Sequence, residues 1–451
     1  MAERYDDGWS PVASRFAPRI YLACVAYKKS IPGGHPPDVC ESAAAEFRAI
    51  AADLGAAGDP REIVPDVVTR LEDEDGFIAH GAARLLTALP FREATEALLA
   101  PGARGARIGT VRFLGRAAPL REEDWDALPN LHPGERPDMV FALLRSPSVS
   151  GRRRFAELLA GGDNVLAEYA IAAVARWHEP RLLRMVIETW KPGPTDIAPL
   201  DVPELHPADL RVEAAFRLAL DGDRSAVDFL MEAATPRRPT ADDRHRAVDA
   251  VIRLGELAWP GAVAAVAELL QTRNKYFLEM TLGAASALRA AALVPSLLDL
   301  AARPRISRDV AEQALLIVEE ITGREPSASQ PAESAAARQK MLLMQRTALL
   351  DLDPALRYLR GTAVGLDGLT GCLTAGHAGP VRSGAYNLRA ITGEDGGFDP
   401  DDDLIANLDG LAFWRERAGR PGPMEPGAWA FAGAPLPSPQ PPDANERVEQ
   451  N

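Results

Sequence analysis

Two segments of this chain end in the same three residues, and that repetition constrains the fold more than any other sequence feature. Ala311–Gly323 reads AEQALLIVEEITG, and Val381–Gly393 reads VRSGAYNLRAITG. Each segment has the pattern of a short apolar helix that ends at Ile-Thr-Gly. Glycine is the residue that most readily takes the left-handed conformation closing a helix, so we expect both glycines to be helix C-caps.

Helical segments of similar length recur through the middle of the chain. Four of them start at Leu210, Arg244, Tyr276 and Ser307, at intervals of roughly 31 to 34 residues. A period in this range is typical of stacked two-helix repeats. The sequence therefore predicts an all-α fold, an α–α superhelix (solenoid) of helical hairpins.

The composition supports this fold class and limits the partners. Hydrophobic residues make up 47% of the chain but aromatic residues only 6%, so Ala and Leu, which are strong helix formers, make up much of the core.

The net charge of −14 argues against nucleic acid as a partner. Three scattered cysteines form no disulfide framework. Without a signal peptide or a membrane-spanning run, we expect a cytoplasmic protein that does not contact a membrane.

Changes in composition divide the chain into five parts. Residues 1–58 are predicted to form an N-terminal helical cap, and residues 59–326 a repeat solenoid. Residues 327–340 are rich in Ser, Ala and Gln and read as a linker or surface loop. Residues 341–418 are predicted to hold further repeats and a closing helix. The Pro-rich stretch 419–451 is predicted to be a disordered tail.

The clearest repeat lies near the start of the solenoid. A helix with an early proline, Ile63–Leu71, is followed by the acidic turn Glu72–Asp75 and by the Ala- and Leu-rich helix Phe77–Leu89. From this pattern residues 59–418 resemble bacterial HEAT-like repeat proteins, including those with phycobilisome-lyase-type repeats. The resemblance implies a protein-binding scaffold, adaptor or assembly factor.

The C-terminal repeats give more specific expectations. Leu366–Leu373 and Val381–Ile391 are predicted to form the last repeat, and Met341–Leu350 a further helix. The closing helix is predicted at Asp403–Arg417, with Asp399 as its N-cap because it precedes a proline.

Candidate interaction residues lie in the middle of the chain. Arg152, Arg153 and Arg154 form the sharpest basic cluster, and Trp177 and Trp190 follow it. The cluster is either a solvated helix start or a set of anchors for a partner. A basic groove of this kind also occurs in HEAT-like alkylpurine DNA glycosylases, which keeps a nucleic-acid-binding alternative open.

No catalytic, cofactor-binding or metal-binding residues are predicted. Deoxyhypusine hydroxylase, an iron enzyme with HEAT-like repeats, uses several His-Glu pairs, and this chain has one, His178–Glu179. Cys24, His35 and Cys40 lack the paired spacing of a zinc site and are expected to be idle or buried thiols and an unligated imidazole. The acidic run 394–403 lacks the glycine and glutamate positions of a calcium-binding EF-hand loop.

These observations favour a non-catalytic scaffold or adaptor that binds another protein along the free face of the solenoid. A few aromatic and arginine anchors would supply specificity. The alternative is a HEAT-fold enzyme or nucleic-acid binder, resembling either an alkylpurine DNA glycosylase or a tetrapyrrole lyase.

Overall fold

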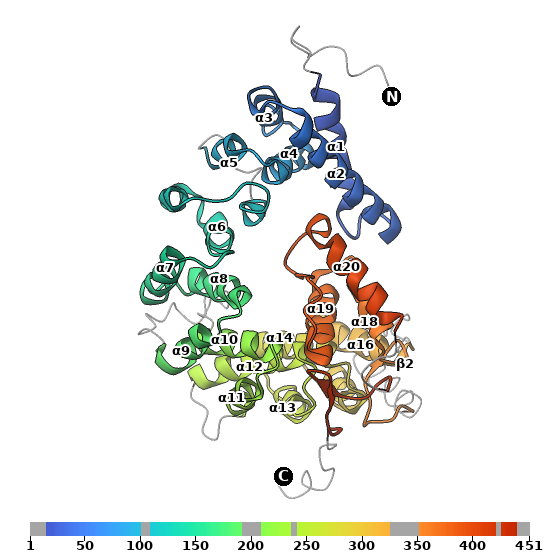
Figure 1. The fold of residues 1–451 in the computed structure, drawn as a ribbon. Helices are drawn as coiled ribbons and strands as arrows, with labels where there is room; N and C mark the ends of the chain where they lie inside the picture. Colours follow the sequence, from blue (N-terminus) through green and yellow to red (C-terminus); the bar gives the residue numbers. More distant parts are fainter. Residues whose placement is uncertain are drawn as a thin grey trace, which may run out of the picture. The chain divides into compact units, whose positions relative to one another are not determined.

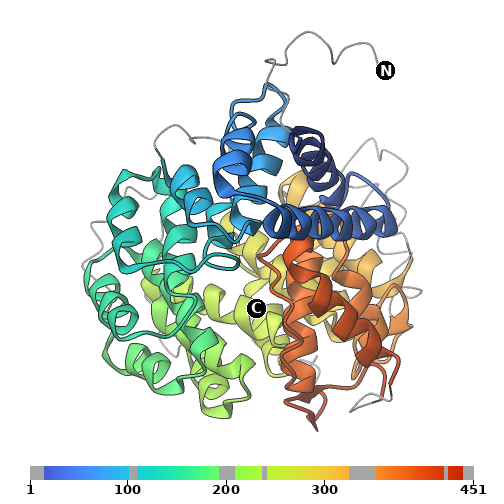
Figure 2. The ribbon, with the colours of Figure 1, turned by 45° about the horizontal axis from the view of Figure 1, so that its top comes forward.

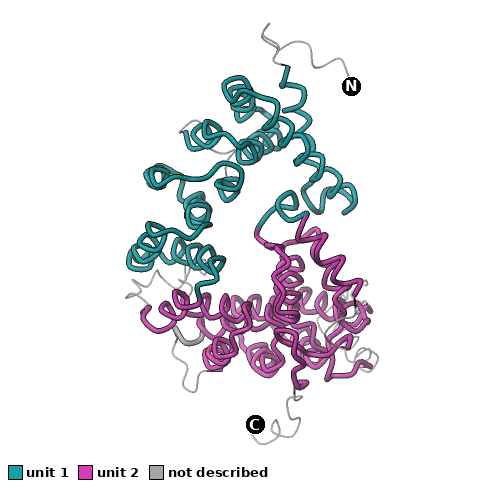
Figure 3. Tube along the Cα trace, viewed as in Figure 1, with its two compact units in different colours: residues 1–179, 402–408 teal, residues 180–401, 409–451 magenta. Residues whose placement is uncertain are grey.

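The computed structural model describes residues 15–100, 109–191, 209–235, 241–324, 351–420 and 425–439. The predicted linker 327–340 and the predicted helix Met341–Leu350 lie outside these residues. Two compact units are present (Figure 3). Unit 1 comprises residues 1–179 and 402–408, and unit 2 comprises residues 180–401 and 409–451. Helices dominate the described residues of both units, which confirms the predicted all-α class.

Unit 1 is a series of helices in which neighbours in sequence pack on one another. The first helix packs on the second and on α4, α3 packs on α4 and α5, and α6 and α7 both pack on α8. In chain order the helices are α1 (Ala17–Ser30), α2 (Pro37–Ala57), α3 (Pro60–Val68), α4 (Gly76–Ala88), α5 (Arg92–Leu99), α6 (Arg136–Leu143), α7 (Val149–Ala160) and α8 (Asn164–Val174). Short 3-10 turns lie at Val111–Phe113, Glu122–Asn130, Pro133–Glu135 and Ala175–Trp177 in the described part of the unit.

Acidic caps and small residues explain why this part of the sequence folds as hairpins. The Asp59 and Asp75 side chains accept hydrogen bonds from the backbone N–H groups of Arg61 and Phe77, so α3 and α4 each begin at a capped residue. A Cβ atom on Gly81 would lie 2.8 Å from the Cα of Cys24. This glycine therefore allows α4 to approach the backbone of α1 closely.

Unit 2 is built from two layers of helices (Figure 1). One layer holds α10, α12, α14 and α16, each packed on the next, and the other layer holds α11, α13 and α15. The helices are α9 (Pro180–Thr189), α10 (Leu210–Leu220), α11 (Arg224–Ala234), α12 (Ala241–Glu256), α13 (Ala262–Leu269), α14 (Lys275–Leu288), α15 (Val294–Ala302), α16 (Arg308–Thr322), α18 (Leu366–Cys372) and α19 (Ala378–Thr392). The helix α20 (Leu404–Ala418) begins in unit 1 and ends in unit 2. Sequential packing of helical hairpins is the architecture that the HEAT-like pattern predicts.

The predicted last helix pair is observed, since α18 and α19 pack on each other. The helix α19 also contacts earlier helices of the unit, which the sequence analysis did not expect. It packs on α10, α12 and α14, across the layer that those helices form (Figure 1 and Figure 2). The side chain of Asn387, which is fully buried, donates hydrogen bonds to the carbonyl oxygens of Gly255 (3.3 Å) and Glu256 (2.8 Å). Because the last carbonyls of a helix lack partners within it, Asn387 satisfies the end of α12. This face of unit 2 is thus covered by the chain's own helix.

Both Ile-Thr-Gly sequences end helices as predicted. Gly323 and Gly393 have φ angles of 67° and 72°, in the left-handed region. The hydroxyls of Thr322 and Thr392 donate to the carbonyls four residues earlier, at 2.8 and 2.7 Å. The two helix ends therefore have the same local geometry, which confirms the C-cap interpretation.

Each of these helix ends also receives a small β-hairpin that the sequence analysis did not expect. Strands β1 (Tyr358–Leu359) and β2 (Thr362–Ala363) form one hairpin, and β3 (Ala430–Phe431) and β4 (Ala434–Pro435) form the other. The turn N–H of Gly361 donates to Ile321 O at 2.9 Å, and that of Gly433 donates to Ile391 O at 2.8 Å. The second hairpin thus repeats the first in its contact with the preceding Ile-Thr-Gly helix.

The second hairpin corrects the prediction of a disordered tail from residue 419 onward. Trp429, Ala430 and Phe431 are buried, and Trp429 Nε1 donates a hydrogen bond of 2.8 Å to Ala355 O. Residues 421–424 and 440–451 lie outside the described part of the chain. Part of the Pro-rich stretch therefore belongs to the core of unit 2.

We predict that Gly323→Ala destabilises the protein by about 2 kcal/mol, because a Cβ costs energy at a left-handed φ. That Cβ would also lie 2.5 Å from Arg360 O. The matched control is Gly283→Ala, where an added Cβ meets nothing within 4 Å and alanine improves helix propensity. Urea unfolding followed by circular dichroism measures both changes. Equal stability of Gly323→Ala and the wild type would contradict the proposed role of the glycine.

Candidate functional site

The predicted basic cluster lies on α7 and is neutralised by nearby glutamates. Arg152 binds Glu179, and their hydrogen bonds raise the pKa of the arginine and lower that of the glutamate. Arg153 lies 3.5 Å from Glu122, and Arg154 lies 3.1 Å from Glu157. These exposed pairs fit a solvated helix surface better than a set of free anchors.

The two predicted tryptophan anchors lie in different units. Trp177, in unit 1, is 7% exposed, and its Nε1 donates a hydrogen bond of 2.7 Å to Leu144 O. Trp190, in unit 2, is half-buried, with the Arg211 guanidinium 5.7 Å from its ring. Trp177 is therefore a core residue of unit 1, and it meets the basic cluster through Arg152, 5.9 Å from its ring.

A second set of arginines, which the sequence analysis missed, recurs along unit 1. We call these five residues the arginine row: Arg84, Arg112, Arg116, Arg145 and Arg176. Arg84 lies on α4, Arg112 and Arg176 on 3-10 turns, and Arg145 just after α6. Four of the five recur about every 30 residues, so one guanidinium comes from each successive repeat. This spacing is the signal that would have revealed the row.

The guanidinium groups of the row lie over the rings of two buried phenylalanines. The Arg84 guanidinium lies 4.1 Å from the ring centroid of Phe113, and that of Arg112 lies 3.8 Å from the ring of Phe141. Arg145 and Arg176 also lie over the Phe141 ring, at 5.6 and 5.0 Å. Planar guanidinium groups stack well on aromatic faces, so the two rings fix several arginines in a small area.

Two adjacent aspartates of unit 1, Asp402 and Asp403, bind this row; we call them the aspartate pair. Asp402 is 3% exposed, accepts from Arg112 Nε at 2.8 Å and also binds Arg116. Asp403 accepts from Arg84 through both Nε (2.6 Å) and Nη2 (3.3 Å). Three arginines of the row, Arg84, Arg112 and Arg116, therefore bind carboxylates, and the chain itself supplies them.

The start of α20 holds the aspartate pair in place. The Asp403 side chain accepts a hydrogen bond of 2.8 Å from the Ala406 backbone N–H, and Asn407 Nδ2 donates to Asp402 O at 3.1 Å. Asp403 thus lies where the helix begins.

Asp399, the predicted N-cap, instead accepts a hydrogen bond from the Asp401 N–H in the preceding turn. The N-cap prediction was four residues early because a proline after an aspartate also fits a turn.

Burial and neighbouring like charges oppose the ionisation of Arg145. Burial is the main cause that lowers the pKa of Arg145 to about 9; Arg116, Arg176 and Arg112 also lower it, whereas Asp402 raises it. Burial is also the main cause that raises the pKa of Tyr27, assisted by Asp403. A carboxylate beside Arg145 therefore favours the charged form of that arginine.

A separate charged network lies under α19 in unit 2. Glu213 is 3% exposed and lies 2.7 Å from both Arg217 and Arg253. Arg253 also binds Glu256 at 2.8 Å, and Glu256 binds Arg382 of α19 at 3.0 Å. Burial alone would raise the pKa of Glu213, but Arg253 and Arg217 outweigh it and lower the pKa to about 2. This network joins α10, α12 and α19.

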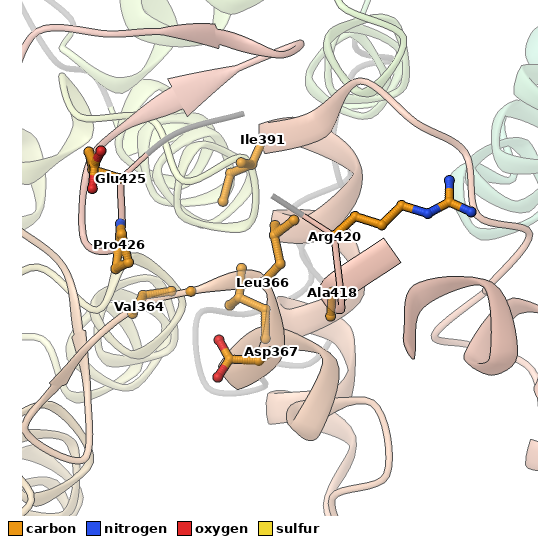
Figure 4. A pocket seen from close by; sticks show the side chains of 10 residues that line it. Val364, Leu366, Asp367, Ile391, Ala418, Arg420, Glu425 and Pro426 are labelled. Atoms are coloured by element: carbon orange, nitrogen blue, oxygen red, sulfur yellow. The ribbon is translucent and has the colours of Figure 1, made fainter. Parts of the chain in front are cut away.

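A pocket of about 200 Å³ lies elsewhere in unit 2 (Figure 4). Val364, Leu366 and Ile391 line it, together with the polar side chains Asp367 and Glu425. Its volume is below the range of most ligand pockets, about 300–1,000 Å³. The arginine row is therefore the stronger candidate site.

The cysteines considered as metal ligands lie in the protein interior. Cys24 and Cys40 are buried free thiols, as expected, and burial raises the pKa of Cys24 to about 12. Across the described ranges, no group of three or more His, Cys, Asp or Glu side chains is arranged to hold a metal ion. In the same ranges no helix has the length and apolarity needed to cross a bilayer.

Comparisons with known proteins add little to this picture. No family profile matches the chain. No curated protein sequence matches it either. Among solved structures, an engineered protein from a structural genomics consortium shares 14% identity, with a TM-score of 0.26 over 82% of this chain and 98% of that one. Human deoxyhypusine hydroxylase in complex with glycerol shares 13% identity, with a TM-score of 0.23 over 75% of this chain and 99% of that one.

The packing within the chain shows the architecture. Successive helical hairpins pack on their neighbours in each unit, and this is the arrangement of HEAT-like repeats. The predicted HEAT-like architecture is confirmed on that basis. The activity of either similar protein is not transferred to this chain.

We predict that Glu213 makes stability depend on pH in the acidic range. Its pKa is lower in the folded protein, about 2, than its ordinary 4.5. Its stabilisation is therefore complete above about pH 4.5 and is lost as the pH falls toward 2. Glu213→Gln should remove that pH dependence and lower stability at pH 7 by about 3 kcal/mol, because it leaves buried arginines without their partner.

Urea midpoints between pH 2 and pH 7 measure this effect. Glu232→Gln, at an exposed position on α11, is the matched control and should follow the wild type. A Glu213→Gln midpoint that keeps the wild-type pH dependence would contradict the assignment.

Proposed function

We propose that this chain is a non-catalytic scaffold or adaptor that binds a protein partner through the arginine row of unit 1, in the cytoplasm. One observation carries the proposal: the row already holds two carboxylates on guanidinium groups stacked over Phe113 and Phe141. Arginines fixed on aromatic rings are typical anchors of protein interfaces. Their fork geometry fits carboxylates from a partner's Asp or Glu side chains.

The other surface considered for a partner, the helical layer of unit 2, is already covered. In unit 2 the layer of α10, α12 and α14 is occupied by α19, so the helical face that the sequence suggested for binding is already used there. The exposed arginines of α7 are satisfied by glutamates. The arginine row remains, with its five guanidinium groups 3.8–5.6 Å from the ring centroid of Phe113 or Phe141.

A nucleic-acid partner is the second candidate, because guanidinium groups also bind phosphates. The net charge of −14 and the carboxylates within the row disfavour it. A DNA glycosylase-like or tetrapyrrole lyase-like activity is the corresponding enzymatic alternative. These alternatives make different predictions for the same variants.

We predict that Arg145→Gln/Arg176→Gln lowers capture of a stoichiometric protein partner at least tenfold, because it removes two charges from the row. The measurement is a pull-down from the native cell with the full chain as bait, quantified by mass spectrometry. Arg153→Gln, in the neutralised α7 cluster, is the matched control and should retain the partner.

Three outcomes oppose the proposal. Equal capture by the row variant and the wild type would remove the row as the binding surface. A salt-dependent shift of DNA mobility that the row variant abolishes would favour the nucleic-acid candidate. Copurified colour that follows the protein would favour tetrapyrrole chemistry.

A further inference from the structure

The aspartate pair occupies the arginine row from a distant part of the sequence. Asp402 and Arg112 are 290 residues apart, and Asp403 and Arg84 are 319 residues apart. We propose that the aspartate pair is a built-in competitor, and that a partner binds the row with an acidic segment of two adjacent carboxylates that displaces it. This inference rests on the proposed function and adds the chemistry of the partner and the regulation of the site.

The bound aspartates define what a displacing ligand must present. The first carboxylate bridges two arginines, Arg112 and Arg116, and the second binds the fork of Arg84 through two nitrogen atoms. Both carboxylates come from consecutive residues, so the spacing between them is that of neighbouring side chains. An acidic peptide with two consecutive aspartates reproduces this arrangement.

The electrostatics of the row allow an exchange of one acidic ligand for another. Arg145 is disfavoured in its charged form by burial and by three neighbouring arginines, and Asp402 acts in the opposite direction. Asp402 therefore offsets part of the cost of charging Arg145, and another carboxylate in its place would act in the same direction. Ion pairs that are buried lose much of their attraction to desolvation, so the internal pair does not hold the site irreversibly.

The connection within one chain sets the strength of the competition. A tethered segment acts at an effective concentration in the millimolar range when its linker permits. An external peptide must compete with that concentration. Its apparent affinity equals the intrinsic affinity multiplied by the fraction of molecules in which the aspartate pair has left the row. Neutralising the internal pair should therefore raise the affinity of the external peptide.

The test uses the full-length protein and a fluorescein-labelled peptide of residues 396–404, GGFDPDDDL. Fluorescence anisotropy should show that Asp402→Asn/Asp403→Asn binds this peptide at least tenfold more tightly than the wild type does. Asp401→Asn is the matched control, because Asp401 is the adjacent aspartate and lies near Arg382 rather than the row, at 3.8 Å. Its affinity should stay within about twofold of the wild type.

Two further arms locate the bound peptide. Adding Arg116→Gln to the neutralised variant should lower peptide affinity at least tenfold, because Arg116 binds Asp402 directly. A peptide with asparagine at the positions of Asp402 and Asp403 should bind none of the proteins detectably. Circular dichroism confirms that each variant is folded before its affinity is compared.

If the neutralised variant does not fold, the wild type itself provides the test. Saturating peptide should displace the aspartate pair and speed hydrogen exchange in residues 402–408, whereas the asparagine peptide should not. Unchanged exchange at saturation would overturn the competition.

The outcomes separate this inference from the proposed function. If the row variants lose the peptide but the neutralised variant binds no more tightly than the wild type, self-competition is wrong and the binding surface stands. If the neutralised variant shows no binding of the peptide, the assignment of an acidic ligand to the row is wrong. Capture of the native partner that still depends on Arg145 and Arg176 would then keep the proposed function.

Discussion

An arginine inside a stack of Ala- and Leu-rich helices must find an oxygen partner, and this requirement organises both units. The guanidinium of Arg84, 4% exposed, meets Asp403, and the fully buried Arg357 donates to Leu288 O at 2.9 Å and to Asn387. Leaving such a donor without a partner costs several kcal/mol. In unit 1, consecutive aspartates from far along the chain supply such oxygens, and in unit 2 Asn387 of α19 supplies one for Arg357.

The same requirement explains why α19 covers the inner layer of unit 2. An apolar stripe would bring α19 against many surfaces, but Asn387 must reach the end of α12, and Arg382 must reach Glu256. These polar contacts fix the register of the helix along α10, α12 and α14. Hydrophobic burial supplies the driving force, and the buried polar groups select one position.

Local features of this structure were predictable from the sequence, whereas distant contacts were not. The helix predicted at Phe77–Leu89 is observed at Gly76–Ala88, and both Ile-Thr-Gly glycines are left-handed caps, because helix periodicity and capping depend on neighbouring residues. The hairpin whose Gly361 N–H binds Ile321 O has two strands of two residues each. Strands this short leave no periodic pattern in the sequence. The arginine row was missed for a related reason: adjacency made Arg152 to Arg154 conspicuous, whereas the row is spread over residues 84–176.

The two charged networks differ in where their carboxylates lie in the chain. In unit 2, Glu213 of α10 binds Arg217 of the same helix and Arg253 of α12, and Arg253 is linked through Glu256 to Arg382 of α19. In unit 1, both carboxylates come from consecutive residues at the start of one helix, next to a turn that contains Gly397 and Pro400. The proposed exchange of the aspartate pair therefore concerns two neighbouring residues of one segment, whereas the carboxylates of unit 2 are spread over two helices and their arginines over three.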